Sequence, residues 1–171
     1  MVSVRDVTPN DKDFYIAVKK EQYSDGLLKL LKEDDAMFVG LWEDVCADNH
    51  RLFAIEDEES GICGFGLLQD LDSGKPSIGI DIFKKQWGKG IATEGVRLIL
   101  QQYHNETGVS EFLWRAFASN TGSNRVAEKL GGVFISEERL EIAPDMTARL
   151  AKNNVDLAEL LPRVKTYQIR I

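Results

Sequence analysis

The amino-acid sequence predicts a single domain of mixed α/β class that spans residues 1–171. Short apolar segments rich in β-branched residues alternate with longer segments in which apolar residues recur every three or four positions, a pattern typical of strands alternating with amphipathic helices. With 171 residues, 43% of them hydrophobic, the chain is long enough to bury a substantial core. No linker or internal repeat divides it, so we expect one domain.

The amino-terminal third contains a predicted strand, two predicted helices and a predicted β-hairpin. They are expected at Val2 to Val7, Asp11 to Gln22, Leu27 to Lys32, and Arg51 to Glu56 paired with Gly61 to Gln69. The first helix follows Pro9 and Asn10, and the second has closely spaced leucines. Acidic clusters follow the second helix, and the hairpin turns at the polar run from Asp57 to Ser60.

The rest of the chain continues this alternation. Strands are expected at Ile78 to Phe83, Glu111 to Ala118, Val133 to Ile142 and Lys165 to Ile171, and helices from Ile91 and from Asn124 to Leu130. The helix from Ile91 is amphipathic, with apolar residues at Ala92, Val96, Ile99 and Tyr103. The next helix stops at Gly131 and Gly132, because glycine commonly ends a helix.

A glycine-rich segment, Trp87 to Thr93, joins the strand at Ile78 to Phe83 to the helix that begins at Ile91. Such a turn leaves backbone N–H groups unpaired and places them at the positive end of the helix dipole. It therefore favours binding of a phosphate group. The alternative is a tight turn without a ligand.

Two common phosphate-binding motifs do not match this segment. The Walker pattern has a Lys after its second glycine and then a Ser or Thr, whereas Lys89 lies between Gly88 and Gly90, and Ile91 follows them. The dinucleotide-binding motif needs a third glycine and an early place in a βαβ array, and the sequence has neither. A nucleotide-binding protein is therefore the less favoured alternative.

The segment matches instead the pattern Q/R-x-x-G-x-G/A, with Trp87 at the first position, Gly90 at the fourth and Ala92 at the last. A second block follows about thirty residues later and reads Ala-Ser-Asn-Thr-Gly-Ser-Asn-Arg-Val-Ala-Glu-Lys-Leu-Gly from Ala118 to Gly131. In this order the two blocks strongly resemble the GNAT superfamily of acyl-CoA-dependent N-acetyltransferases. The resemblance is greatest to the branch that includes the ribosomal-protein-alanine N-acetyltransferases.

This resemblance implies a GNAT fold, in which a central, mostly antiparallel sheet of about six or seven strands is flanked by helices and splays at the strand ending near Phe83. It also implies acetyl-CoA as cosubstrate. Loop N–H groups would bind its pyrophosphate, with charge added by Lys89, and three strand residues would present backbone groups to the pantetheine arm and the thioester carbonyl. The implied cofactor-binding residues are Ile80, Ile82, Phe83, Gly88, Lys89, Gly90, Ile91, Ala92, Thr93 and Asn120.

Local structural roles are the alternatives for two of these residues. Thr93 can bond phosphate through its hydroxyl or cap the first helical turn. Asn120 matches the asparagine that reaches the cofactor arm in the resembled family, but asparagine is also a common turn residue.

Two residues are candidates for catalysis. Ser123 matches a serine that is a proposed acid for the departing thiolate in the resembled branch, and a helix N-cap is its equally favoured alternative. Asp81 is the candidate general base because it is the only carboxylate within its strand, where it lies opposite Ile80 and Ile82 and faces either the substrate cleft or solvent. The chain departs from common family residues at Pro76-Ser77, where many members have Glu, at Ala127, where many have Tyr, and at Gly132, where Phe is common.

The resemblance predicts direct attack of an amine on acetyl-CoA, without a covalent enzyme intermediate. Keeping a lysine-like amine of pKa ~10.4 neutral at pH 7 costs about 4.6 kcal/mol, but an α-amine of pKa ~8 costs only about 1.4 kcal/mol. Because no base is obvious, a protein amino terminus is slightly favoured over a small-molecule amine. A non-catalytic acyl-CoA-binding or sensing module is the alternative, since the common Tyr and Glu are absent.

The segment from Asp145 to Leu161 is a further departure from the resembled branch, in which this connection is usually short. Its composition predicts helical material. It would cover the acceptor site, contact a second copy in a homodimer, or simply pack as a helix.

Charge argues against a nucleic-acid partner. The formal net charge is −7, from 21 basic and 28 acidic residues. The same balance can attract a cationic amine. No apolar run is long enough to span a bilayer, and Arg5 and Asp6 interrupt the first apolar segment, so we expect a cytoplasmic protein without a membrane partner.

The cysteine and histidine pattern predicts no metal site. Cys46 and Cys63 have no C-x-x-C spacing, and we expect both to be reduced structural thiols. His50 and His104 are far apart in sequence, and His104 is expected in the last turn of the helix after the glycine-rich segment, where a cation complements the carbonyl end.

Overall fold

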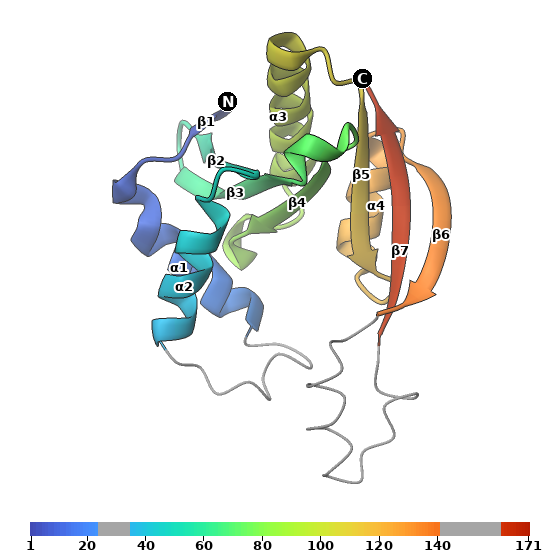
Figure 1. The fold of residues 1–171 in the computed structure, drawn as a ribbon. Coiled ribbons are helices and arrows are strands. Elements are labelled where there is room, and N and C mark those ends of the chain that lie inside the picture. Colours follow the sequence, from blue (N-terminus) through green and yellow to red (C-terminus); the bar gives the residue numbers. More distant parts are fainter. Residues whose placement is uncertain (24–34, 141–161) are drawn as a thin grey trace, which may run out of the picture.

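The computed structural model describes residues 1–23, 35–140 and 162–171. In this part of the chain, seven strands form one sheet in the order β1-β2-β3-β4-β5-β7-β6 (Figure 1). The strands are β1 (Val2–Asp6), β2 (His50–Asp57), β3 (Gly61–Gln69), β4 (Ser77–Ile82), β5 (Glu111–Phe117), β6 (Val133–Arg139) and β7 (Arg163–Arg170). Only the β4–β5 pairing is parallel among these neighbours, which confirms the predicted mixed, mostly antiparallel fold.

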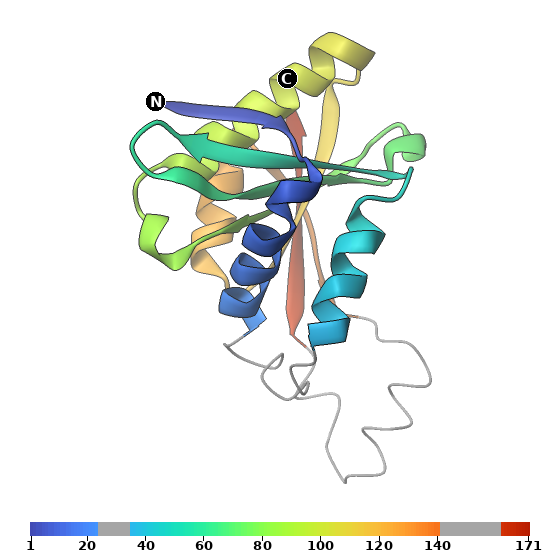
Figure 2. The ribbon, with the colours of Figure 1, turned by 90° about the vertical axis from the view of Figure 1, so that its left-hand side faces the viewer.

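Helices cover both faces of the sheet. The α-helices are α1 (Lys12–Tyr23), α2 (Asp35–Val45), α3 (Ile91–Thr107) and α4 (Thr121–Lys129), and the short 3₁₀ helices are η1 (Pro9–Asp11), η3 (Leu71–Ser73) and η4 (Lys84–Gln86). Figure 2 shows α1 and α2 on the opposite side of the amino-terminal strands from α3. The two faces therefore bury separate groups of apolar side chains.

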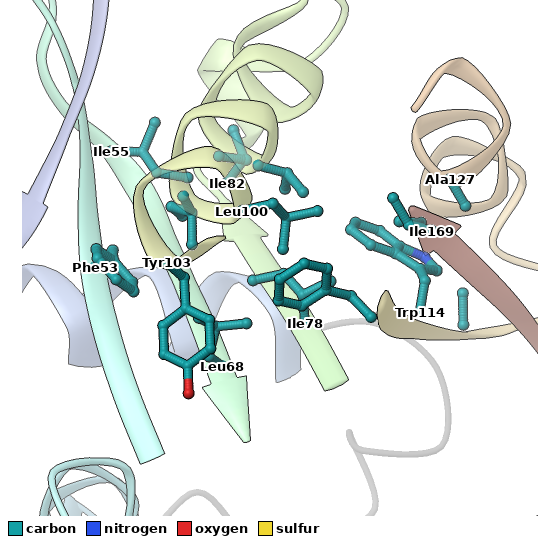
Figure 3. Packing of buried hydrophobic residues seen from close by; sticks show 14 of the residues in the cluster. Phe53, Ile55, Leu68, Ile78, Ile82, Leu100, Tyr103, Trp114, Ala127 and Ile169 are labelled. Atoms are coloured by element: carbon teal, nitrogen blue, oxygen red, sulfur yellow. The ribbon is translucent and has the colours of Figure 1, made fainter. Parts of the chain in front are cut away.

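The larger core lies between the sheet and α3. Phe53 and Ile55 of β2 and Ile78 and Ile82 of β4 pack there with residues of α3 such as Leu100 (Figure 3). The intervening strand positions face α1 and α2, in a smaller cluster that contains Tyr15, Val18, Val45, Leu52, Ala54, Phe65 and Phe83. This division follows from the two-residue period of a strand, and it fixes which side of β4 each of its side chains faces.

Most of the elements predicted from the sequence are present within a few residues of their expected limits. One described helix was not predicted, although α2 has the helical spacing of apolar residues at Phe38, Leu41, Trp42 and Val45. The nearby acidic residues had suggested only polar clusters. The helices predicted at Leu27 to Lys32 and Asp145 to Leu161 lie outside the described residues.

The sheet packs tightly at two glycines of β3. A Cβ atom at Gly64 would lie 2.2 Å from the backbone oxygen of Asp81, and one at Gly66 would lie 2.3 Å from Cδ1 of Ile99. A side chain at Gly64 would push the backbone of β4 away from β3, whereas one at Gly66 would require the Ile99 side chain to move. The absence of side chains at these glycines thus allows β3 to pack closely against β4 and α3, the elements that flank the candidate site.

We predict that Gly64→Ala destabilises the fold by about 1–3 kcal/mol, because the added methyl group would overlap the Asp81 carbonyl. Gly79→Ala on β4 is the control, since a Cβ atom there would meet no heavy atom within 4 Å. Urea denaturation of both variants and the wild type measures the difference. Equal stability of Gly64→Ala and the wild type would contradict this packing.

Candidate active site

The strands β4 and β5 form a fork. Their parallel pairing includes only two residue pairs, Ser77 with Leu113 and Ile78 with Trp114. Beyond Ile78 the two strands diverge (Figure 1). The edge of β4 from Gly79 to Ile82 therefore has no strand partner on its β5 side among the described residues, as the predicted splay requires.

The backbone groups of Ile80 and Ile82 face this open edge. The Phe83 N–H donates to the Cys63 carbonyl of β3 at 3.0 Å, and backbone direction alternates along an antiparallel strand, so Asp81 and Gly79 also face β3. The even-numbered residues face away from β3. At the base of the fork, the Leu113 N–H donates to the Pro76 carbonyl at 3.0 Å, which places β5 on that same side.

Phe83 differs from its expected role. Its N–H is bonded to Cys63, and its carbonyl accepts from the Gln86 N–H at 2.8 Å. Both backbone groups of Phe83 are thus engaged within the chain, because the strand turns into η4 at this residue. Its side chain is buried against α1, as expected for core.

The glycine-rich loop leads from the end of β4 to α3. Gly88 and Gly90 have φ of +76° and +81°, a left-handed conformation that other residues adopt at a cost. Gly90 is the N-cap residue, without a side-chain hydrogen bond, and the Glu94 N–H donates to its carbonyl at 3.1 Å. The N–H groups of Ile91, Ala92 and Thr93 precede that bond and have no acceptor within the helix.

Side chains of the loop make their own hydrogen bonds near the start of α3. Thr93 lies in the first turn of α3, and Gly90 is the residue at the N-cap position. Lys89 Nζ donates to Oε1 of the buried Gln86 at 2.7 Å, and the indole N–H of Trp87 donates to the Ile82 carbonyl at 2.8 Å. The exposed loop can therefore receive an anion at the amino end of α3, with an ammonium group at its edge.

Asp81 lies on the α1 side of the sheet. Its carboxylate is 2.5 Å from Nζ of Lys19, and the two side chains are 24% and 19% exposed. Lys19 also lies over the ring of Tyr15, 5.5 Å from its centroid. The carboxylate proposed as a base is therefore paired with an ammonium group of α1, a partner that the sequence pattern did not suggest.

Asn120, and not Ser123, is the N-cap of α4. The Asn120 Oδ1 accepts from the Ser123 N–H at 3.0 Å, so the helix starts three residues earlier than predicted. The N-cap alternative for Ser123 is wrong, because Ser123 already lies in the first turn. Buried Asn124 also stabilises this turn, since its Nδ2 donates to the Asn120 carbonyl at 2.8 Å.

The Ser123 hydroxyl lies near the base of the fork. Its oxygen accepts a hydrogen bond from the indole N–H of Trp114 at 3.2 Å, and Trp114 is the residue paired with Ile78 in the last β4–β5 pair. A hydroxyl that accepts from Trp114 keeps its own proton for another acceptor. Trp114 is almost fully buried, and its sequence position alone gave no signal of this contact.

Ser123 and Asp81 lie on opposite faces of the sheet. Trp114, the partner of Ser123, belongs to the core under α3 and α4, whereas Asp81 faces α1. The open edge of β4 lies between them. A ligand that occupied this edge would therefore have a hydroxyl donor near one face and a carboxylate near the other.

The remaining candidate chemistry is limited. Cys46 and Cys63 are free thiols, and burial raises the pKa of the Cys63 thiol, which keeps it protonated. Residues 1–23, 35–140 and 162–171 hold no group of three or more His, Cys, Asp or Glu side chains arranged to bind a metal. No helix in these ranges is both long and apolar enough to cross a membrane.

Comparison with known proteins identifies the family. Residues 2–133 match the family model described as acetyltransferase (GNAT) domain. The chain belongs to this family. A curated relative from Bacillus licheniformis, an uncharacterized N-acetyltransferase p20, is 30% identical over 74 residues, and the match covers 43% of this chain and only 41% of the relative.

Solved structures share the fold at low sequence identity. A chimera of Vibrio cholerae spermidine N-acetyltransferase and hSSAT has a TM-score of 0.75 at 17% identity, with 99% of this chain and 95% of that chain covered. Vibrio cholerae spermidine N-acetyltransferase in complex with CoA and spermine has a TM-score of 0.74 at 15% identity, with the same coverage. A domain from Methanocaldococcus jannaschii has a TM-score of 0.65 at 17% identity, with 100% and 99% covered. These similarities confirm the predicted GNAT fold.

We predict that Gly90→Asp weakens acetyl-CoA binding at least ~10-fold, because it places a carboxylate among N–H groups suited to an anion. Gly108→Asp is the matched control at the other end of α3, where φ is +78° and the backbone strain is therefore similar. Calorimetric titration measures both dissociation constants. Unchanged affinity in Gly90→Asp, or equal loss in both variants, would contradict the loop assignment.

Proposed function

We propose that this protein transfers an acetyl group from acetyl-CoA to a primary amine. The observation that carries this proposal is the unpaired edge of β4 beside the uncapped amino end of α3. One element offers amide pairing to an extended chain, and the other offers N–H groups to an anion. Acetyl-CoA has both features, since an amide-containing arm connects its pyrophosphate to its thioester.

The residues present fit this cosubstrate. The N–H groups from Gly88 to Thr93 would bind the pyrophosphate, and the ammonium of Lys89 lies close enough to add charge. Ile80 and the N–H of Ile82 would pair with the pantetheine arm and polarise the thioester carbonyl. The engaged backbone of Phe83 leaves no role for it in this pairing. Asn120, whose side chain caps α4, would contact the cofactor arm from the start of that helix.

The two faces of the fork suggest how the protons move. A neutral amine attacks the thioester carbon directly, its lost proton passes to Asp81 or to water on the α1 side, and the C–S bond breaks. The departing sulfur takes a proton from the Ser123 hydroxyl, which Trp114 orients, and the serine oxygen takes a proton back from water. No covalent enzyme intermediate is needed in this scheme.

The acceptor is proposed as a small cationic amine or a protein amino terminus. Spermidine acetyltransferases share the fold, and the net charge of −7 suits a cationic amine. An α-amine has a lower pKa than a lysine-like amine and depends less on a general base. This favours a protein amino terminus as acceptor, as in the ribosomal-protein-alanine N-acetyltransferases. One similar structure is a dodecameric spermidine N-acetyltransferase, so we also propose self-association, with a homodimer as its smallest form.

The function is tested by thiol release from acetyl-CoA in the presence of polyamines, other small amines and peptides with a free amino terminus. Acetylation of one class, verified by product mass, would support the proposal and define the acceptor. Tight binding of acetyl-CoA without amine-dependent release across all classes would favour a non-catalytic sensing module. Binding of ATP or NAD in place of acetyl-CoA would contradict the assignment.

We predict that Ser123→Ala lowers kcat by ~10- to 100-fold and changes the KM for acetyl-CoA by less than about twofold, because the leaving sulfur loses its donor while the glycine-rich loop and the open edge of β4 are unchanged. The change also removes the acceptor of the Trp114 indole N–H. Ser119→Ala, in the loop that precedes α4, is the control. Steady-state kinetics with the best acceptor measure both parameters. An unchanged kcat would remove Ser123 from the mechanism.

A further inference from the structure

The carbonyl oxygen of Ile82 is a point where three parts of the chain meet. It faces the open edge of β4, because the Phe83 N–H next to it is directed toward β3. Gln22 Nε2 of α1 donates to this oxygen at 3.0 Å, and the indole N–H of Trp87 donates to it at 2.8 Å. A carbonyl oxygen has two lone pairs, so these two donors occupy both.

The two donors determine where the open edge ends. Alternation leaves the Ile80 groups and the Ile82 N–H facing the fork, whereas the Ile82 carbonyl is occupied. An extended chain that pairs with β4 cannot continue past this carbonyl without displacing a side chain. The capped oxygen also directs no free lone pair toward the reacting thioester.

The contacts of α1 with this end of β4 are not limited to Gln22. The Lys84 N–H donates to Oε2 of Glu21 at 2.9 Å, and Lys19 pairs with Asp81 at 2.5 Å. Residues of the last two turns of α1 thus contact Asp81, Ile82 and Lys84 around the end of β4. Since Trp87 begins the glycine-rich loop, the Ile82 carbonyl links the helix on the Asp81 face to the proposed anion site.

We propose that Gln22 and Trp87 are positioning residues that act together through the Ile82 carbonyl. They fix the end of the pairing edge and hold the phosphate loop at a set distance from α1, so that the acetyl group stops beside the amine. This inference rests on the proposed acetyl transfer. In this inference the indole N–H of Trp87 holds the Ile82 carbonyl, a role that the glycine motif does not require of the residue at this position.

The first test compares Trp87→Phe, Gln22→Met and the double variant. Each single change keeps most of the side-chain bulk and removes the donor. We expect each to lower kcat by ~5- to 50-fold with the Kd of CoA within about twofold of the wild type, because the anion site is intact while the acetyl group is misplaced. The double variant should lie within about twofold of the slower single variant, since both residues act through one carbonyl.

Gln101→Met is the matched control. Gln101 is an exposed residue of α3, and its side chain donates a hydrogen bond to Asn105, away from β4 and the glycine-rich loop. It should leave kcat unchanged. Unchanged kcat in both donor variants, independent multiplicative losses, or a parallel rise in the Kd of CoA would each overturn the proposal. The last result would show a general disturbance of the loop.

A second measurement does not depend on catalysis. A ¹⁵N correlation spectrum records one indole N–H signal for each of Trp42, Trp87 and Trp114, and the signal that is lost in Trp87→Phe belongs to Trp87. Gln22→Met should shift this signal, because the two donors share one acceptor, and Gln101→Met should not. An unmoved signal would refute the shared carbonyl even if acetyl transfer is confirmed. A shifted signal in a protein without transferase activity would support the shared carbonyl and contradict the proposed function instead.

Discussion

The short pairing between β4 and β5 is the constraint on which the rest of the site depends. Two residue pairs join the strands, and β4 then follows β3 while β5 follows β7. Backbone groups of Ile80 and Ile82 consequently face a gap within a sheet whose other neighbours are paired. Unpaired strand edges bind extended chains by adding main-chain hydrogen bonds. The fork thus offers the position at which we propose that the acyl carrier binds.

The glycine-rich loop extends this pre-arranged geometry to the anion. The left-handed conformations of Gly88 and Gly90 set the course of the turn that leads into α3. Bonds from Gln86, Trp87 and Lys89 hold the loop against the end of β4. The same turn would therefore connect the phosphate end and the reactive end of the proposed cosubstrate. Ser123 and Asp81 lie on opposite faces of the sheet, from which they would approach that reactive end.

Local sequence patterns predicted the strands, the main helices and the glycine-rich loop, because hydrophobic period and glycine spacing are local properties. The prediction was less complete where contacts join distant parts of the chain. The Lys19–Asp81 pair, the Trp114–Ser123 bond and the two donors on Ile82 each link separate elements, and no spacing rule reveals them. Helix α4 begins earlier than expected, because the side chain of Asn120 caps it, whereas the sequence had suggested Ser123 as a cap. Both backbone groups of Phe83 are hydrogen-bonded within the chain, and the sequence did not indicate this because the residue at which a strand turns depends on bonds to its neighbours.

Amide hydrogen exchange along β4, measured with and without acetyl-CoA, tests the central claim most directly. Gly79 and Asp81 donate toward β3 and should be protected in both states. Ile80 and Ile82 should exchange faster in the free protein and become protected when acetyl-CoA binds, because the ligand supplies the missing partner. Binding that leaves the exchange of Ile80 and Ile82 unchanged would show that the open edge of β4 does not hold the acyl carrier, and the account of this site would be wrong.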